Sequence, residues 1–153
     1  MNAPTHAPSC TLRAMLGGEG RVHVVTRKLA FDAQGRTSED PEATLPSALD
    51  LLVAALATDL LAGLARDAAR AGHPLHDAEA SLSARLENPL VALGVIGESG
   101  HAGIAEVTGS FYVRCDAGER ELHELWARTL ARSPAHATLA RAADVRLELK
   151  PML

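Results

Sequence analysis

The sequence predicts an α+β fold in which a largely antiparallel sheet packs against one long central helix. Residues 46–72 are mostly apolar, open on Pro46-Ser47 and close on Gly72, which are typical helix start and stop signals. Segments with alternating apolar residues lie on both sides of this helix and predict strands. Because the strands come in pairs with helices between them, the order β-β-α-β-β-α-α-β favours antiparallel pairing.

The first half of the chain contains a predicted hairpin. Residues 9–16 and 21–31 alternate and are joined by a glycine-rich turn, which is typical of two paired strands. Residues 32–44 are polar and carry turn residues, so they predict a loop. Beyond the long helix, residues 76–87 and 104–115 predict two further strands.

The remaining segments are shorter. Residues 88–103 have glycines at intervals of three and predict a mobile loop, with a short strand as the alternative. Residues 116–132 have leucines and a tryptophan at helical spacing and predict an amphipathic helix. A third, short helix is expected to start at 133–142, and residues 144–152 predict the last strand.

The long helix is unusual because its first two-thirds are apolar nearly all the way round. Such a helix is normally buried on every side. A chain of 153 residues has little room to surround it, so we expect a second protomer to provide part of the cover. The charged end of the helix, with Arg66, Asp67 and Arg70, is expected to be a solvated face.

The composition is that of one globular domain, which we place at 9–153 after a flexible tail at 1–8 without the features of a signal peptide. The net charge is −4 and the basic residues are scattered, so nucleic acid is not an expected partner. No uninterrupted apolar run reaches the roughly 18–20 residues that span a bilayer, so no membrane partner is expected. Two isolated cysteines without an export signal predict a cytoplasmic location.

Two motifs resemble the OsmC/Ohr family of hydroperoxide-reducing proteins and their relatives. In that family the long helix begins with Pro, continues through an acidic residue, Leu-Leu and small residues, and reaches a reactive Cys. Residues 46–58 follow this run, and Asp59 stands at the Cys position. The family's second Cys lies in an Arg-Cys-Pro-X-X-X-Thr-Leu segment, which residues 132–139 resemble with Ser133 at the Cys position. The similarity spans roughly residues 9–150.

The resemblance implies an intertwined homodimer with the long helices at its centre. Family members reduce peroxides through a thiolate that becomes a sulfenic acid and is resolved by the second Cys. With Asp59 and Ser133 in place, both redox sulfurs are absent. In the family an Arg near the first glycine-rich turn activates the reactive Cys, and Arg21 or Glu19 is the counterpart here. The candidate ligand-binding residues are therefore Asp59, Ser133, Arg21 and Asp50.

Asp59 and Ser133 each have two interpretations. Asp59 is either a structural carboxylate satisfied by a cation or a helix end, or an acid, base or ligand anchor in an apolar cleft with a raised pKa. Ser133 before Pro134 is typical of a helix cap, and it is also placed to donate to a ligand. A hydrolytic arrangement of Ser133, His136 and Asp59 is a further alternative.

Other polar residues predict less. His73 and His76 have metal-like spacing, but Pro74 between them disfavours a preformed site, so neither a metal nor a cofactor is expected. Cys10 and Cys115 match no redox position of the family and are expected to be small core or edge residues.

The function predicted from the sequence is that of an OsmC-like homodimer that lacks peroxidase chemistry and binds a small, partly apolar ligand at its interface. The alternative is an organic hydroperoxide reductase of the stress response that uses a relocated thiol, Cys115, or an enzyme that uses Asp59 in another reaction. An interaction protein whose dimer surface is the function is the third hypothesis.

Overall fold

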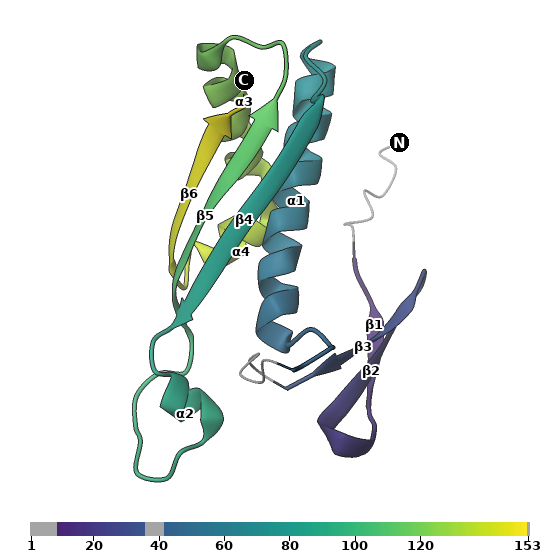
Figure 1. Cartoon of the computed structure of the whole chain (residues 1–153), viewed down its shortest axis with the longest axis vertical. Helices are drawn as coiled ribbons and strands as arrows, with labels where there is room; N and C mark the ends of the chain where they lie inside the picture. The colour runs from purple at the N-terminus through teal and green to yellow at the C-terminus, as the bar shows by residue number, and fades with distance from the viewer. Residues whose placement is uncertain (1–8, 36–41, 153) are drawn as a thin grey trace, which may run out of the picture. The chain divides into compact units, whose positions relative to one another are not determined.

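The structure is a computed structural model and describes residues 9–35 and 42–152 (Figure 1). The flexible tail predicted at residues 1–8 lies outside the described residues. The chain divides into two compact units, Met1–Asp50 and Leu51–Leu153. That residues 9–153 act as one domain stays a prediction.

The first unit contains a three-stranded antiparallel sheet in the order β1-β2-β3. Its strands are β1 (Leu12–Leu16), β2 (Arg21–Thr26) and β3 (Ala30–Gln34), with a short 3-10 turn at Gly18–Gly20 between the first two. The hairpin of β1 and β2 is confirmed. The prediction of one strand over 21–31 followed by a loop is wrong, because a turn at Thr26 divides the run. Its Oγ1 accepts the backbone N–H groups of Lys28 and Leu29, and β3 follows.

The long helix is α1 (Ala48–Arg70), close to the predicted 46–72. Its buried residues recur at helical spacing and are Leu56, Leu60, Gly63, Leu64, Asp67 and Ala68. Within the single chain, Leu52 is 43% exposed and the alanines at 54, 55, 62 and 65 are exposed, so the cover expected from a second protomer stays a prediction. The prediction of a solvated charged end is wrong for Asp67, which is only 8% exposed.

The second unit contains a three-stranded sheet in the order β4-β5-β6. Its strands are β4 (Asp77–Leu86), β5 (Ile104–Arg114) and β6 (Asp144–Pro151). β4 and β5 are antiparallel, but β5 and β6 are parallel, so the described strands form two small sheets with one parallel pair. A parallel pair needs a long crossover. The predicted helices provide it as α3 (Glu119–Arg132) and α4 (Pro134–Leu139).

The core of the second unit lies between one face of this sheet and the helices α1 and α3, which Figure 1 shows beside and behind the sheet. Phe111 of β5 and Trp126 of α3 meet there, with ring centroids 4.8 Å apart. Glycine is required at position 109, because an added Cβ would lie 2.6 Å from the Ser81 carbonyl oxygen. The bare backbone at Gly109 therefore lets β4 and β5 pack closely.

The segment predicted as a loop over 88–103 contains a short helix, α2 (Pro89–Leu93). The Asn88 side chain accepts the N–H groups of Leu90 and Val91, so it caps the helix. Gly94 ends the helix with a φ of 74°, a left-handed conformation that favours glycine. Figure 1 shows α2 beyond the end of β4 and β5, and the prediction of an unstructured segment is wrong here.

Helix α1 is long and apolar enough to cross a membrane by length and composition, with a mean hydropathy of 1.9 over 18 residues. The sequence argument against a membrane considered only uninterrupted apolar runs, which Thr58 and Asp59 break. A core helix of a globular protein meets the same criterion. Leu56, Leu60 and Leu64 are fully buried in the core of the second unit, so packing explains the apolar residues on that side of α1, while 22% of the 18-residue window as a whole is buried.

Candidate functional site

Asp59 and Ser133, predicted from separate motifs, are in direct contact. The Ser133 hydroxyl donates to Asp59 Oδ2 at 2.7 Å, and the Ala135 backbone N–H donates to the same oxygen at 3.1 Å. Ser133 is 4% exposed and also caps α4, because its Oγ accepts the His136 backbone N–H at 3.0 Å. The capping interpretation of Ser133 is confirmed, and Asp59 has the structural hydrogen bonds that one of its interpretations expected.

Both side chains line one pocket of about 260 Å³ within the second unit. We call it the α1–α3 pocket, and its lining residues are Asp59, Gly63, Arg66, Asp67, Arg70, Thr129, Arg132 and Ser133. Most of them are charged or carry a hydroxyl group. The pocket is therefore polar, in contrast to the apolar cleft that the sequence suggested around Asp59.

The charged end of α1 forms part of the lining of this pocket. The sequence analysis did not predict a site at that end of the helix. Asp67 is buried, and Arg132 Nη1 lies 3.5 Å from its Oδ1. A helical spacing of three and four residues places positions 59, 63, 66 and 70 along one side of a helix. That spacing is visible in the sequence, but the approach of α3 that buries Asp67 is not.

Gly63 sets the distance between the two helices of the pocket. A Cβ added at Gly63 would lie 3.2 Å from Thr129 Cγ2 of α3 and 4.0 Å from an Arg66 guanidinium nitrogen. The glycine therefore lets α3 approach closely, and it leaves space that the Arg66 side chain overlies.

An apolar hollow of about 320 Å³ lies next to the pocket. Its lining residues are Leu52, Pro134, Ala135, Thr138 and Leu139. Because the Ala135 N–H donates to Asp59, this residue links the hollow to the α1–α3 pocket. One side of α1 therefore carries an apolar recess at Leu52 and a polar one between Asp59 and Arg70.

Asp50, another predicted site residue, has a structural partner at the start of α1. Its Oδ2 accepts from the Ser47 backbone N–H at 2.8 Å and from the Ser47 hydroxyl at 2.7 Å, while its own N–H donates to Ser47 Oγ. This reciprocal pattern is a capping box. The hydrogen bonds from the Ser47 hydroxyl and backbone lower the pKa of the Asp50 carboxyl, since they favour its charged form.

We expect Asp50→Asn to destabilise the protein by about 0.3–1 kcal/mol at neutral pH, because it removes the negative charge of the capping box at the start of α1 while Ser47 remains as the cap. A carboxyl with a lowered pKa stabilises the fold above its unfolded pKa, near 3.8, and that contribution is lost as the pH falls through the lower folded value. The difference between wild type and variant in urea denaturation should therefore shrink in acid. The exposed Glu79→Gln should show no such difference, and a pH-independent loss in Asp50→Asn would contradict the prediction.

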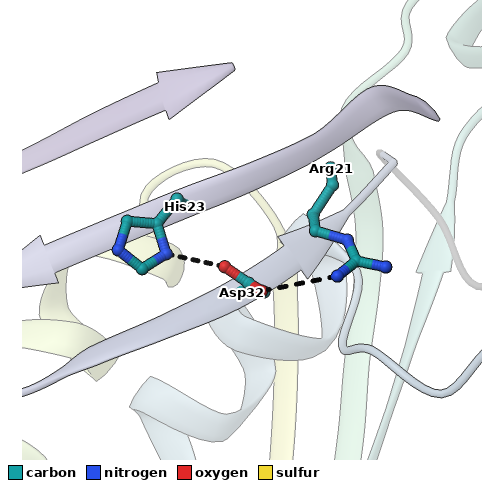
Figure 2. A network of polar contacts seen from close by, with 3 residues as sticks. All are labelled: Arg21, His23 and Asp32. Atoms are coloured by element: carbon teal, nitrogen blue, oxygen red, sulfur yellow. Dashed lines mark hydrogen bonds and ion pairs between the residues drawn. The ribbon is translucent and has the colours of Figure 1, made fainter. Parts of the chain in front are cut away.

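Arg21 lies on β2, where its Nη1 is 3.7 Å from Asp32 Oδ2 (Figure 2). His23 Nδ1 lies 2.7 Å from the other oxygen of the same carboxylate. Asp32 on β3 thus joins two side chains of the neighbouring strand. A ligand-binding role for Arg21 and Asp50 stays a prediction, and the Glu19 side chain, the other candidate, lies outside what is described.

The remaining candidate residues have local partners. His73 Nε2 lies 3.1 Å from Glu121 Oε2, and His76 Nε2 lies 3.1 Å from Asp116 Oδ2. No group of three or more His, Cys, Asp or Glu that would hold a metal occurs among the described residues.

Cys10, Cys115 and His136 are the residues on which the alternative catalytic hypotheses depend. Cys10 is exposed, Cys115 is half-buried against the core of the second unit, and both thiols are free. The hydrogen bond that joins His136 to Ser133 uses the His136 backbone N–H rather than its imidazole. It therefore gives no support to a hydrolytic triad.

The sequence and the structure were each compared with those of known proteins. The sequence profile of the OsmC-like protein family matches residues 40–148. No curated protein gives a significant sequence match. An OsmC-like protein from Mycoplasma pneumoniae has a similar structure, with a TM-score of 0.80, 17% identity, and 95% of this chain and 99% of that chain covered.

Structures of organic hydroperoxide resistance proteins are similar as well. OhrB of Bacillus subtilis has a TM-score of 0.61 and 19% identity over 93% of this chain and 98% of its own. The protein from Elizabethkingia anophelis has a TM-score of 0.63 and 12% identity over 95% of this chain and 99% of its own. At these identities the structures demonstrate a shared fold, and the profile covers well over half of the sequence. The chain therefore belongs to the OsmC-like protein family.

Proposed function

We propose that this OsmC-like protein has no thiol peroxidase activity and binds a small, partly apolar molecule. One observation carries the proposal. Asp59 and Ser133 stand where the two cysteines of the OsmC/Ohr motifs would be, and their carboxylate and hydroxyl oxygens lie 2.7 Å apart in the lining of one pocket. The two cysteines of the sequence, Cys10 and Cys115, do not line that pocket. Neither oxygen side chain has an oxidation state that replaces a sulfenic acid or a disulfide.

The two neighbouring recesses support the choice of ligand class. A molecule with an apolar part fits the hollow around Leu52 and Leu139, and a polar end fits the α1–α3 pocket. Ligand sites commonly combine an apolar lining with a few polar groups that fix orientation. The Asp59 carboxylate lines the polar pocket and accepts the N–H of Ala135, a residue that lines the apolar hollow, so the two recesses meet at this hydrogen bond.

A cytoplasmic homodimer is part of the proposal. The exposed side of α1 carries alanines at 54, 55, 62 and 65, and small residues allow two helices to approach closely. Leu52, which lines the apolar hollow, is exposed at the edge of the same surface. Pairing of two α1 helices would bury this surface next to the recesses. Sedimentation equilibrium at micromolar concentration is expected to give twice the chain mass, and a monomer would contradict this part.

Turnover of cumene hydroperoxide with dithiothreitol tests the absence of peroxidase chemistry. We expect the wild-type protein and Cys115→Ser to consume peroxide no faster than dithiothreitol alone. Wild-type turnover that Cys115→Ser abolishes would instead support the relocated thiol, whose half-buried position beside the core gives it little access. Native mass spectrometry of the purified protein should reveal a retained small molecule if its ligand binds tightly.

A gain of function tests the geometry of the pair. The double variant Asp59→Cys/Ser133→Cys should acquire thiol-dependent peroxide reduction, because it places two sulfurs at positions whose side chains now touch. The control is Thr58→Cys/Ala137→Cys, which places thiols at exposed positions of α1 and α4 that line neither recess. Equal rates in both double variants, or none in a correctly folded Asp59→Cys/Ser133→Cys, would show that the pocket no longer accepts peroxides.

A further inference from the structure

The charges of the α1–α3 pocket are unevenly satisfied. Each of its two carboxylates has a partner in the protein: Asp59 accepts two hydrogen bonds, and Asp67 pairs with Arg132. Arg66 and Arg70 have no acidic partner within ion-pair distance among residues 9–35 and 42–152. With three arginines and two aspartates on its lining, the pocket has a formal charge of +1 and two unpaired guanidinium groups.

The Arg66 side chain is exposed, and it also lines the α1–α3 pocket. One guanidinium nitrogen of Arg66 lies 4.0 Å from the position that a Cβ of Gly63 would occupy. The guanidinium group therefore lies over the backbone at Gly63. Arg70 lies four residues further along α1 and lines the same pocket. Both groups therefore approach one space from the same helix.

Stabilisation of α1 and α3 by cations at their ends accounts for the positions of Arg70 and Arg132 but not for that of Arg66. Arg70 and Arg132 end their helices, where a cation is stabilised by the helix dipole. Arg66 lies before the last turn of α1 and forms a like-charged i,i+4 pair with Arg70, which costs about 0.2–0.5 kcal/mol in a helix. An anion between the two guanidinium groups would turn this repulsion into attraction.

We infer that the α1–α3 pocket is an oxyanion site that binds the carboxylate or phosphate group of a small organic ligand through Arg66, Arg70 and Arg132. The inference rests on the proposed function, because it names the polar end of the ligand proposed there. Guanidinium groups suit these anions since they donate paired hydrogen bonds in a fixed plane. The volume of about 260 Å³ is at the small end for ligand pockets, so the site takes a head group rather than a polyanion.

Three probe molecules distinguish binding through the oxyanion from binding through the apolar alkyl chain of the ligand. Octanoate carries both an oxyanion and an apolar chain, 1-octanol carries only the chain, and inorganic phosphate carries only the oxyanion. Isothermal titration at low ionic strength is expected to show octanoate binding at least tenfold more tightly than 1-octanol, and binding of phosphate that weakens with added salt. Acetate, a carboxylate without the octyl chain, is compared with inorganic phosphate to identify the head group: tighter binding of acetate would indicate a carboxylate ligand, and tighter binding of phosphate a phosphate ester.

The variants Arg66→Gln and Arg70→Gln should each weaken octanoate and phosphate binding by roughly tenfold, the usual loss for one hydrogen bond to a charged group. The matched control is Arg128→Gln, an exposed arginine of α3 one turn before Arg132 that does not line the pocket. Binding of 1-octanol should be the same in all three variants. Circular dichroism confirms that each variant is folded.

The outcomes distinguish this inference from the proposed function. If octanoate and 1-octanol bind alike and neither arginine variant changes the affinity, the oxyanion site is wrong while the partly apolar ligand stands. If phosphate binds and the arginine variants abolish this, but the octyl chain adds nothing, the oxyanion site stands and the apolar part of the proposed ligand is wrong. If no probe binds, or Arg128→Gln weakens binding as much as Arg66→Gln, the oxyanion site is overturned.

Discussion

Replacing Phe111 with alanine is expected to lower the free energy of unfolding by about 3–5 kcal/mol, the range for a large aromatic side chain removed from a core. Phe111 is fully buried on β5, the middle strand of the β4-β5-β6 sheet. Its ring lies against Trp126 at 4.8 Å between centroids, and the rings are tilted by 46°. This is an aromatic contact that adds to the burial of apolar area.

The surrounding core has little capacity to fill the resulting cavity. Only 3% of the residues are aromatic, and the other buried side chains are mainly Leu, Val and Ala held by α1 and the sheet. Such a close-packed interior relaxes only partly around a deletion, so the cavity adds to the lost transfer free energy. Phe111→Leu, which keeps most of the volume, should therefore cost much less than Phe111→Ala.

Urea denaturation followed by tryptophan fluorescence measures this effect directly, because the one Trp of the chain contacts Phe111. The matched control is Tyr112→Ala, the next residue of the same strand, whose half-exposed ring lies on the opposite face near Lys150. The control should cost less than half as much as Phe111→Ala. Equal losses at the two positions would contradict the packing described here.

The elements that the sequence predicted correctly are those with a long, regular pattern. Helix α1 has clear start and stop signals, and β4 alternates over its whole length. The elements that were missed, β3 and α2, are each five residues long. Over five residues a periodic pattern is too short to identify its period by itself, and β1, which is equally short, was predicted with the help of the glycine-rich turn that follows it. The Asn88-Pro89 pair is a cap followed by a first-turn proline, and it was the one available signal for α2.

The pairing of strands was harder to predict than their positions. Alternation identifies a strand but carries no information about its neighbours, so the parallel pairing of β5 with β6 was missed. Two helices between these strands form a crossover long enough for a parallel pair. Burial of α1 on every side was inferred from its apolar surface together with a second protomer, and the alanines that are exposed in the single chain leave that part a prediction.

The site was predicted in part. Asp59 and Ser133 were predicted from two motifs that lie 74 residues apart in the sequence. The structure brings the two side chains into contact. Asp67 could not be predicted as buried, because its cover comes from α3 and its partner Arg132. Charges near a helix end are usually solvated, and only tertiary packing overrides that expectation.

The hydrogen bonds of Asp59 lead to the second large effect. We expect Asp59→Ala to lower the free energy of unfolding by about 1.5–3 kcal/mol, the range for hydrogen bonds to a charged group. The Ser133 hydroxyl and the Ala135 N–H would both lose their acceptor at the start of α4. Thr58→Ala, at the exposed preceding position of α1, should stay within about 0.5 kcal/mol of wild type.

A double-mutant cycle isolates the contact between the two side chains. Ser133→Ala alone removes the same hydrogen bond and the cap of α4, so its cost includes about 1 kcal/mol for the cap. If the contact stabilises the fold, the double variant Asp59→Ala/Ser133→Ala should be more stable than the sum of the single effects predicts, by about 1–2 kcal/mol. Additive losses would mean that the serine and the aspartate stabilise the protein independently. The 2.7 Å hydrogen bond would then contribute no coupling energy, and the separate bonds from the Ala135 N–H to Asp59 and from the His136 N–H to Ser133 would account for the single losses.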